Sequence, residues 1–144
     1  MTGPESVAII GLSGRFPKSR NLDTFWRNIR DGVECISFFS EAELIDAGMD
    51  PAEIGNPGFV NAGAVLEDLD QFDASFFGYS PRDAEIMDPQ QRVFLEAAFH
   101  ALEDAAYNPF TYDGLIGVFA GSGMSSYLLD LYADPALLAQ TSMD

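Results

Sequence analysis

The chain has 144 residues, of which 47% are hydrophobic and 21% charged, a composition typical of a globular domain rather than a disordered one. No apolar run approaches the roughly 20 residues that a membrane-spanning helix needs. The net charge of −16 would repel nucleic acid and anionic membrane surfaces, so neither is an expected partner. The single cysteine excludes an internal disulfide and a cysteine-based metal cluster. The first residues do not resemble a secretory signal, and we expect a cytoplasmic protein.

The first predicted elements are a strand and a helix. Residues 7–10 (VAII) form a short apolar run that predicts a buried strand. The stretch from Gly11 to Gly14 predicts a turn with a positive φ angle. Asn21 is a good N-cap for the helix that follows, and Gly32 is placed to end it. The apolar side chains of this helix fall on one face: Leu22, Phe25, Trp26 and Ile29.

Two short capped helices are predicted next. One begins at Ser40 and stops at Gly48, the other begins at Asp50 and stops at Gly55, and each has a glutamate three residues after its cap. Residues 59–65 then predict a strand.

The longest predicted helix begins at Pro89 and is apolar on nearly all sides. It follows two further helix starts, at Asp73 and Ser80, and has Asp88 as its N-cap and Gln91 in position for a capping box. One apolar face is formed by Phe94, Ala97, Ala98, Ala101 and Ala105, and a second by Leu95, Phe99, Leu102 and Ala106. Its polar stripe consists of Arg92, Glu96, His100 and Glu103. Such a helix is typical of a position between two layers of structure.

A second buried strand is predicted over residues 115–120, which are apolar throughout and end at Gly121. Ser125 or Ser126 is expected to cap a helix, and Asp134 to begin another.

The glycine turn after this strand has two interpretations. Gly121-Ser122-Gly123 fits part of a dinucleotide-binding fingerprint, in which glycines let backbone N–H groups approach a pyrophosphate. The third glycine of that fingerprint would fall at Ser126, so a tight turn is favoured.

The sole histidine and the sole cysteine do not form an active site by themselves. His100 has Glu96 and Asp104 one helical turn away, which predicts a solvated or ion-paired position. Cys35 follows Glu34 and has no basic neighbour in sequence that would lower its pKa. No metal ligand set and no cofactor-binding residue is identified.

Several blocks together resemble the beginning of a β-ketoacyl synthase domain of modular polyketide synthases and multifunctional fatty acid synthases. The blocks are VAIIGLSGRFP (7–17), NLDTFWRNIRDG (21–32), FDASFFGYSPRDAEIMDPQQRVFLEAAFHALEDAAY (72–107) and IGVFAGSG (116–123). The resemblance implies an α/β, thiolase-like fold, layered α-β-α-β-α, of which residues 1–144 are the incomplete N-terminal portion.

The resemblance also implies a function. Members of the family are homodimeric acyltransferases that catalyse a decarboxylative Claisen condensation of acyl and malonyl-type thioesters. The substrates are presented on the phosphopantetheine arm of an acyl carrier protein, which with the adjacent synthase domains is an expected partner.

The catalytic residues of the family are not expected within this chain. The nucleophilic cysteine and two histidines would lie downstream of Asp144, and neither Cys35 nor His100 matches them, so the 144 residues alone are expected to be inactive. The resemblance places Ser122, Gly123 and Met124 beside the acyl pocket or the dimer partner, with Met124 as an adjustable pocket floor or plain core filling. A nucleotide-binding α/β module and a non-catalytic scaffold related to condensing enzymes are the alternatives.

Overall fold

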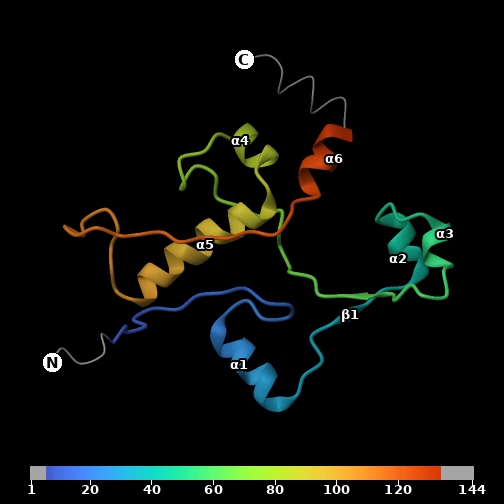
Figure 1. The fold of residues 1–144 in the computed structure, drawn as a ribbon, viewed down its shortest axis with the longest axis horizontal. Coiled ribbons are helices and arrows are strands. Elements are labelled where there is room, and N and C mark those ends of the chain that lie inside the picture. Colours follow the sequence, from blue (N-terminus) through green and yellow to red (C-terminus); the bar gives the residue numbers. More distant parts are fainter. Residues whose placement is uncertain (1–5, 134–144) are drawn as a thin grey trace. The chain divides into compact units, whose positions relative to one another are not determined.

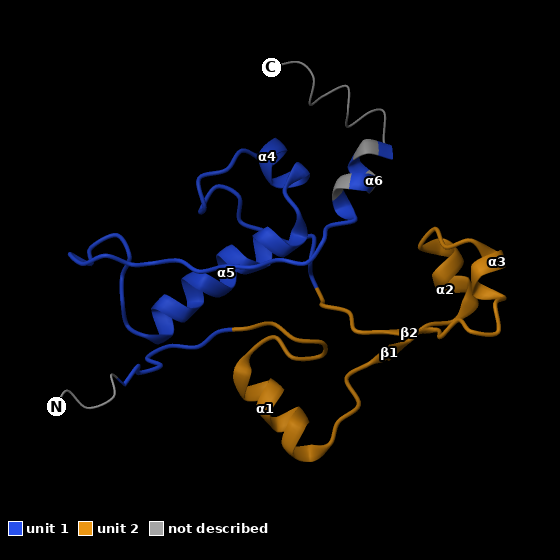
Figure 2. Cartoon of the chain, in the orientation of Figure 1, with its two compact units in different colours: residues 1–13, 68–144 blue, residues 14–67 orange. Residues whose placement is uncertain are grey.

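The structure, a computed structural model, describes residues 6–133 (Figure 1). Its helices and strands follow in the order α1 (Leu22–Asp31), β1 (Ser37–Phe38), α2 (Glu41–Asp46), α3 (Pro51–Ile54), β2 (Ala62–Gly63), α4 (Pro81–Ile86), α5 (Pro89–Asp104) and α6 (Tyr127–Ala133). The chain divides into two compact units, which are coloured separately in Figure 2. Unit 1 comprises residues 1–13 and 68–144, and unit 2 comprises residues 14–67.

Unit 2 begins with α1, whose two ends form as the sequence predicts. The Asn21 side chain accepts a hydrogen bond from the Thr24 N–H at 2.9 Å. At the other end Gly32 adopts the left-handed conformation with φ 65°, which costs glycine little. Phe25 of α1 stacks on Phe16, with ring centroids 3.9 Å apart. The predicted helix is therefore confirmed, including its caps.

The short helices α2 and α3 are also confirmed. Ser40 and Glu43 form a complete capping box, in which each side chain accepts a hydrogen bond from the backbone N–H of the other. Asp50 caps α3 by accepting from the Ala52 N–H at 2.8 Å. Local side-chain chemistry is sufficient to start these helices, because each cap satisfies an N–H group that has no partner inside the helix.

The predicted strand over 59–65 is confirmed only at its centre. Ala62 and Gly63 form β2, which pairs with β1 in antiparallel register, Ser37 opposite Gly63 and Phe38 opposite Ala62. This ladder joins the two ends of the segment that holds α2 and α3, so it closes that segment into a loop.

Unit 1 is built around α5. Asp88 caps the helix by accepting from the Gln90 N–H at 2.7 Å, and Pro89 occupies the first helical position. The predicted capping box is not formed: the Asp88 side chain accepts its hydrogen bond, but Gln91 lies exposed and does not complete the reciprocal one. The preceding helix α4 has a full capping box between Ser80 and Asp83. Asp73 starts a turn rather than the predicted helix, with its carboxylate accepting from the Phe76 N–H at 3.0 Å.

Aromatic rings connect this turn to α5. Phe76 meets Phe99 of α5 edge-on, with centroids 4.9 Å apart. Phe77 stacks on Phe72 at 5.1 Å and contacts Phe76 edge-on at 5.0 Å. Edge-on and stacked pairs at these distances are favourable geometries for aromatic side chains. The cluster fixes the 72–79 segment against the middle of α5.

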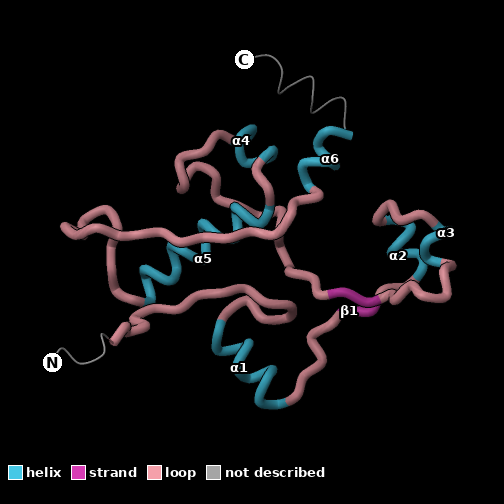
Figure 3. The backbone as a smooth tube through the Cα atoms, viewed as in Figure 1, coloured by secondary structure: helices cyan, strands magenta, loops and turns pink. Residues whose placement is uncertain are grey.

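The two predicted apolar strands of unit 1 are not formed. Residues 7–10 and 115–120 are extended segments without ladder pairing, and Figure 3 shows them as loop on either side of α5. Val7, Leu115 and Phe119 are almost fully exposed. A buried strand needs neighbouring strands to satisfy its backbone groups, and no described segment of unit 1 supplies one. The prediction of buried strands at these positions is therefore wrong for this structure.

The expectation that α5 is enclosed between layers is also wrong for the residues described. None of its side chains is buried, and Phe94 is exposed. Among the side chains that the structure describes, only Leu44, Ala84 and Ser19 are buried. The apolar faces of α5 are thus only partly covered.

Two helices are predicted after the glycine turn, one capped by Ser125 or Ser126 and another beginning at Asp134. The first of these helices is confirmed as α6, where the Leu129 N–H donates to the Ser126 carbonyl at 2.8 Å. The helix start at Asp134 lies outside the described residues. No described helix is both long enough and apolar enough to cross a membrane.

Candidate functional site

The predicted site turn, residues 121–124, lies at the N-terminal end of α5. It connects the extended segment 115–120 with α6, and its residues are exposed. The Gly123 N–H donates a hydrogen bond to Gln90 Oε1 at 3.2 Å. Gln90 is the second residue of α5, so the turn is held by the helix rather than by its own sequence neighbours.

Two further contacts join the same corner of unit 1. The Tyr127 hydroxyl, at the start of α6, donates to the Glu85 carbonyl in α4. The pKa of the Asp88 carboxyl is held below its ordinary value, mainly by the nearby Ser125 hydroxyl and to a lesser extent by the Gln90 N–H. The carboxylate therefore stays ionised and keeps its role as a cap at neutral pH.

These contacts count against the nucleotide-binding interpretation of the turn. A pyrophosphate needs free backbone N–H groups directed at it, and the Gly123 N–H is already used by Gln90. The ionised Asp88 beside Ser125 would repel an anion at this position.

Met124 projects fully into solvent in the described structure. It does not line any of the described pockets, so the assignment of Ser122, Gly123 and Met124 to an acyl pocket stays a prediction.

An apolar groove of about 560 Å³ runs along α5 between the two extended segments. It is lined by Ala8, Ile9, Ile10 and Gly11 from the first segment, Leu115, Ile116, Gly117, Val118 and Phe119 from the second, and Ala98, Ala101, Leu102, Ala105, Tyr107 and Tyr112 between them. The only ionisable side chains in this lining are the two tyrosines. The groove can accept aliphatic or aromatic groups but offers no acid–base pair.

Gly11 of the first segment lies close against α5. A Cβ atom at this position would lie 2.3 Å from the Ala101 carbonyl oxygen and 2.8 Å from Ala105 Cβ. The next residue, Leu12, donates its N–H to Asp104 Oδ2 at 2.9 Å. The predicted positive φ at Gly11 and Gly14 is wrong, since neither is among the positive-φ glycines of the described chain. Gly11 is required by close approach, which the sequence pattern did not reveal.

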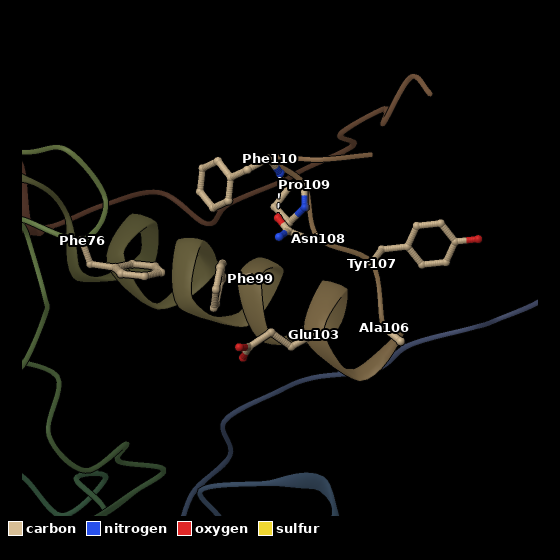
Figure 4. Close-up of a pocket in the computed structure, with 8 residues that line it drawn as sticks. All are labelled: Phe76, Phe99, Glu103, Ala106, Tyr107, Asn108, Pro109 and Phe110. Carbon is tan, nitrogen blue, oxygen red and sulfur yellow. Dashed lines mark hydrogen bonds between the residues drawn. The ribbon is translucent and has the colours of Figure 1, made fainter. Parts of the chain in front are cut away.

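A second hollow, of about 460 Å³, lies at the C-terminal end of α5. Figure 4 shows the rings of Phe76, Phe99 and Phe110 on one side of the helix, with the Tyr107 ring extending away from them. The Phe110 N–H donates to Asn108 Oδ1 at 2.9 Å, which fixes the loop above the hollow. Among its lining residues only Glu103 and Tyr107 are ionisable, so this hollow also lacks an acid–base pair suited to catalysis.

His100 and Cys35, which the sequence does not assign to an active site, do not line the described groove or hollow. His100 Nδ1 lies within hydrogen-bond distance of Glu103 Oε2, at 2.9 Å, so the partner of the histidine is Glu103 rather than Glu96 or Asp104. Its side chain is 64% exposed. Cys35 is a half-buried free thiol in unit 2, whereas His100 belongs to unit 1. Within residues 6–133 no group of three or more potential metal ligands is present.

Comparison with known proteins identifies the family. The sequence profile described as "Beta-ketoacyl synthase, N-terminal domain" matches residues 4–143. The chain is 45% identical over 130 residues to a component of the phenolphthiocerol/phthiocerol polyketide synthase of Mycobacterium tuberculosis, covering 90% of this chain and 9% of that protein. It is 46% identical over 129 residues to polyketide synthase ThaG of Burkholderia thailandensis, covering 87% of this chain and 2% of that protein.

Solved structures give the same result. Ketosynthase twelve of the bacillaene polyketide synthase from Bacillus amyloliquefaciens is similar with a TM-score of 0.60 and 45% identity, over 67% of this chain and 17% of that one. The module 6 ketosynthase of the bacillaene synthase from Bacillus subtilis is similar with a TM-score of 0.59 and 36% identity, over 72% of this chain and 17% of that one. The 144 residues thus span a small part of each relative and contain part of the α/β, thiolase-like fold of the ketosynthases. The chain belongs to the β-ketoacyl synthase family and corresponds to its N-terminal domain.

Proposed function

We propose that this chain is the N-terminal portion of a ketosynthase domain in a modular polyketide synthase. The observation that supports this most directly is the 45% identity, with a TM-score of 0.60, to a ketosynthase of the bacillaene synthase. The proposed reaction is decarboxylative Claisen condensation. An enzyme thiolate attacks the carbonyl of a carrier-bound acyl thioester and releases the carrier thiol. A malonyl-type extender then loses CO₂, and the resulting carbanion attacks the acyl-enzyme carbonyl, which forms the new C–C bond and releases the enzyme thiolate.

In this proposal residues 1–144 have structural and pocket-lining roles. The acyl-accepting cysteine and the two histidines are assigned to sequence beyond Asp144, because neither Cys35 nor His100 stands at a position where the family resemblance places them. The substrates would arrive on the phosphopantetheine arm of an acyl carrier protein. A homodimer, neighbouring synthase domains and a cytoplasmic location belong to the same proposal.

The test uses the protein expressed from the complete open reading frame. It is incubated with an acyl thioester and a malonyl-loaded carrier protein, and intact mass spectrometry follows both proteins. The proposal expects an acyl adduct on the enzyme, then a β-ketoacyl group on the carrier with release of CO₂. The 144-residue chain alone is expected to give neither product.

The outcomes separate the alternatives. Failure of the complete protein to form an adduct, with the carrier correctly loaded, would refute the enzymatic proposal and favour a non-catalytic scaffold. Saturable binding of NAD or ATP would instead support the nucleotide-binding alternative, which the internal use of the Gly123 N–H disfavours.

A further inference from the structure

The start of α5 carries a buried polar atom that nothing in the described chain satisfies. Arg92 as a whole is half-buried, but its Nε atom is buried and has no hydrogen-bond acceptor among the described residues. The N–H group at Nε can only donate a hydrogen bond. A buried donor without an acceptor costs free energy, and folded proteins nearly always supply one. Arg92 therefore points to a partner outside the described residues.

Ser125 presents a second such atom close by. Ser125 Oγ is buried and makes no hydrogen bond of normal geometry among the described residues. The Ser125 hydroxyl nevertheless lies near Asp88, since it is the largest cause of the lowered pKa of that carboxyl, to which the charge of Arg92 also contributes. Arg92 follows Asp88 by four positions, so the two lie on the same face of α5. Ser125 and Arg92 are therefore both neighbours of Asp88.

Asp88 itself does not satisfy either atom. Its carboxylate caps α5, where Oδ1 accepts from the Gln90 N–H at 2.7 Å. It leaves Arg92 Nε and Ser125 Oγ without a hydrogen bond. Two donors at this corner of unit 1 are therefore available to a further acceptor.

A carboxylate is the acceptor that fits these two donors. A guanidinium presents its Nε–H and one terminal N–H side by side, and a carboxylate accepts from both at once. A carboxylate oxygen also accepts from a serine hydroxyl. A backbone carbonyl would accept one of these bonds but would not balance the charge of a half-buried guanidinium. The site therefore favours an aspartate or glutamate side chain.

We infer that Arg92 and Ser125 form a docking site for an aspartate or glutamate side chain in the part of the ketosynthase domain that follows residue 144. The chain spans 17% of the bacillaene ketosynthase of Bacillus amyloliquefaciens to which it is similar, so most of such a domain lies in other sequence. The inference rests on the proposed function, because it requires the chain to continue as a ketosynthase domain. The contact would hold the later part of the domain against the first turns of α5.

The first arm of the test identifies the carboxylate by zero-length cross-linking of the protein from the complete open reading frame. Arg92→Lys places an amine at the site, and a water-soluble carbodiimide joins this amine to a carboxylate in contact with it. Mass spectrometry of the peptides then identifies the carboxyl residue. Gln91→Lys is the matched control, because Gln91 is the exposed residue next to Arg92.

The inference expects a cross-link within one chain between position 92 and an aspartate or glutamate after residue 144, which Gln91→Lys does not give. A cross-link only to a carboxylate within the first 144 residues would overturn the inference, as would no cross-link. A product of twice the mass would place the carboxylate on a second copy of the chain and would also overturn it.

The second arm measures amide hydrogen exchange in residues 88–96 of Arg92→Met in the same protein. If a carboxylate binds Arg92, this change leaves it buried without its partner, and exchange is expected to accelerate by about tenfold or more. If only water meets Arg92, the change removes a buried donor, and exchange would be unchanged or slower. That result would contradict the inference. Gln91→Met is the control and is expected to stay within about twofold of the wild type.

A double-mutant cycle joins the two arms. The carboxyl residue found by cross-linking is replaced by its amide, alone and together with Arg92→Met. A direct contact predicts a combined effect on exchange that is smaller than the product of the single effects by about threefold or more, whereas a simple product would refute the contact.

None of these readouts needs turnover, so the inference and the proposed function can fail separately. A protein that shows the cross-link but no condensation would refute the proposed function and keep the docking site. A protein that condenses but shows no cross-link would refute the docking site alone.

Discussion

Replacing Gly11 with alanine tests the contact that holds the first extended segment against α5. The added Cβ would lie 2.3 Å from the Ala101 carbonyl oxygen, whereas a C···O contact is about 3.3 Å or longer. The segment would have to withdraw by about 1 Å. The 2.9 Å hydrogen bond from the Leu12 N–H to Asp104 would then exceed the length of a normal N–H···O bond.

The expected cost follows from two opposing effects. Overpacking of this kind costs about 1–3 kcal/mol, while the Gly→Ala change gains about 0.4–1 kcal/mol by restricting the unfolded chain. The central values leave a net loss of about 1.3 kcal/mol, which corresponds to about a tenfold increase in opening of the segment.

The measurement is amide exchange in peptides covering residues 7–13, with Gly121→Ala as the matched control. Gly121 ends the other extended segment, and an added Cβ there meets nothing within 4 Å. Gly11→Ala is expected to exchange faster in residues 7–13, and Gly121→Ala to match the wild type there. Equal exchange in the two variants would refute the close-approach argument.

Three further outcomes are expected. Ser80→Ala removes the hydroxyl that accepts a hydrogen bond from the Asp83 N–H and is expected to destabilise α4 by about 1 kcal/mol. Amide exchange in residues 80–87 should become faster, and unchanged exchange would contradict the capping role. Hydrogen bonds from the Ser40 hydroxyl and N–H lower the pKa of Glu43 below its ordinary value of 4.5. The cap therefore stabilises α2 fully above that pH, and this stabilisation is lost as the pH falls through the lowered pKa. An NMR titration of the Glu43 carboxyl that gives an ordinary midpoint would disprove this prediction. The isolated 144-residue chain is expected to self-associate in sedimentation experiments, because residues 115–119 expose apolar side chains, and a monomer that melts cooperatively would argue against this.

Helix starts could be predicted from the sequence because each depends on residues within one turn. Asn21, Ser40, Asp50 and Ser80 all accept a hydrogen bond from an N–H two or three residues further on, as the pattern indicated. Asp73 was the exception. Its carboxylate accepts in the same way, but the chain after it makes a turn whose rings pack on α5 instead of continuing as a helix.

The candidate site could be predicted only in part. The turn at residues 121–124 was identified by its glycines and by its resemblance to a known family. The role of Gln90 was missed, because its partner Gly123 is 33 residues away and no local pattern connects them. The role of Gly11 was missed for the same reason, since its neighbours Ala101 and Ala105 lie on a distant helix.

The sequence by itself determined the family of this protein, the positions of α1 to α6 and the chemistry of the caps at Asn21, Ser40, Asp50 and Ser80, all of which depend on residue identity or on neighbours one turn apart. Tertiary structure decided whether the apolar segments 7–10 and 115–120 become strands, because a strand satisfies its backbone groups only through pairing with another segment. It also decided the register of β1 with β2 and the attachment of the 121–126 turn to α5. Each of these depends on which distant residues meet, and that information is in the folded chain rather than in any local stretch of it.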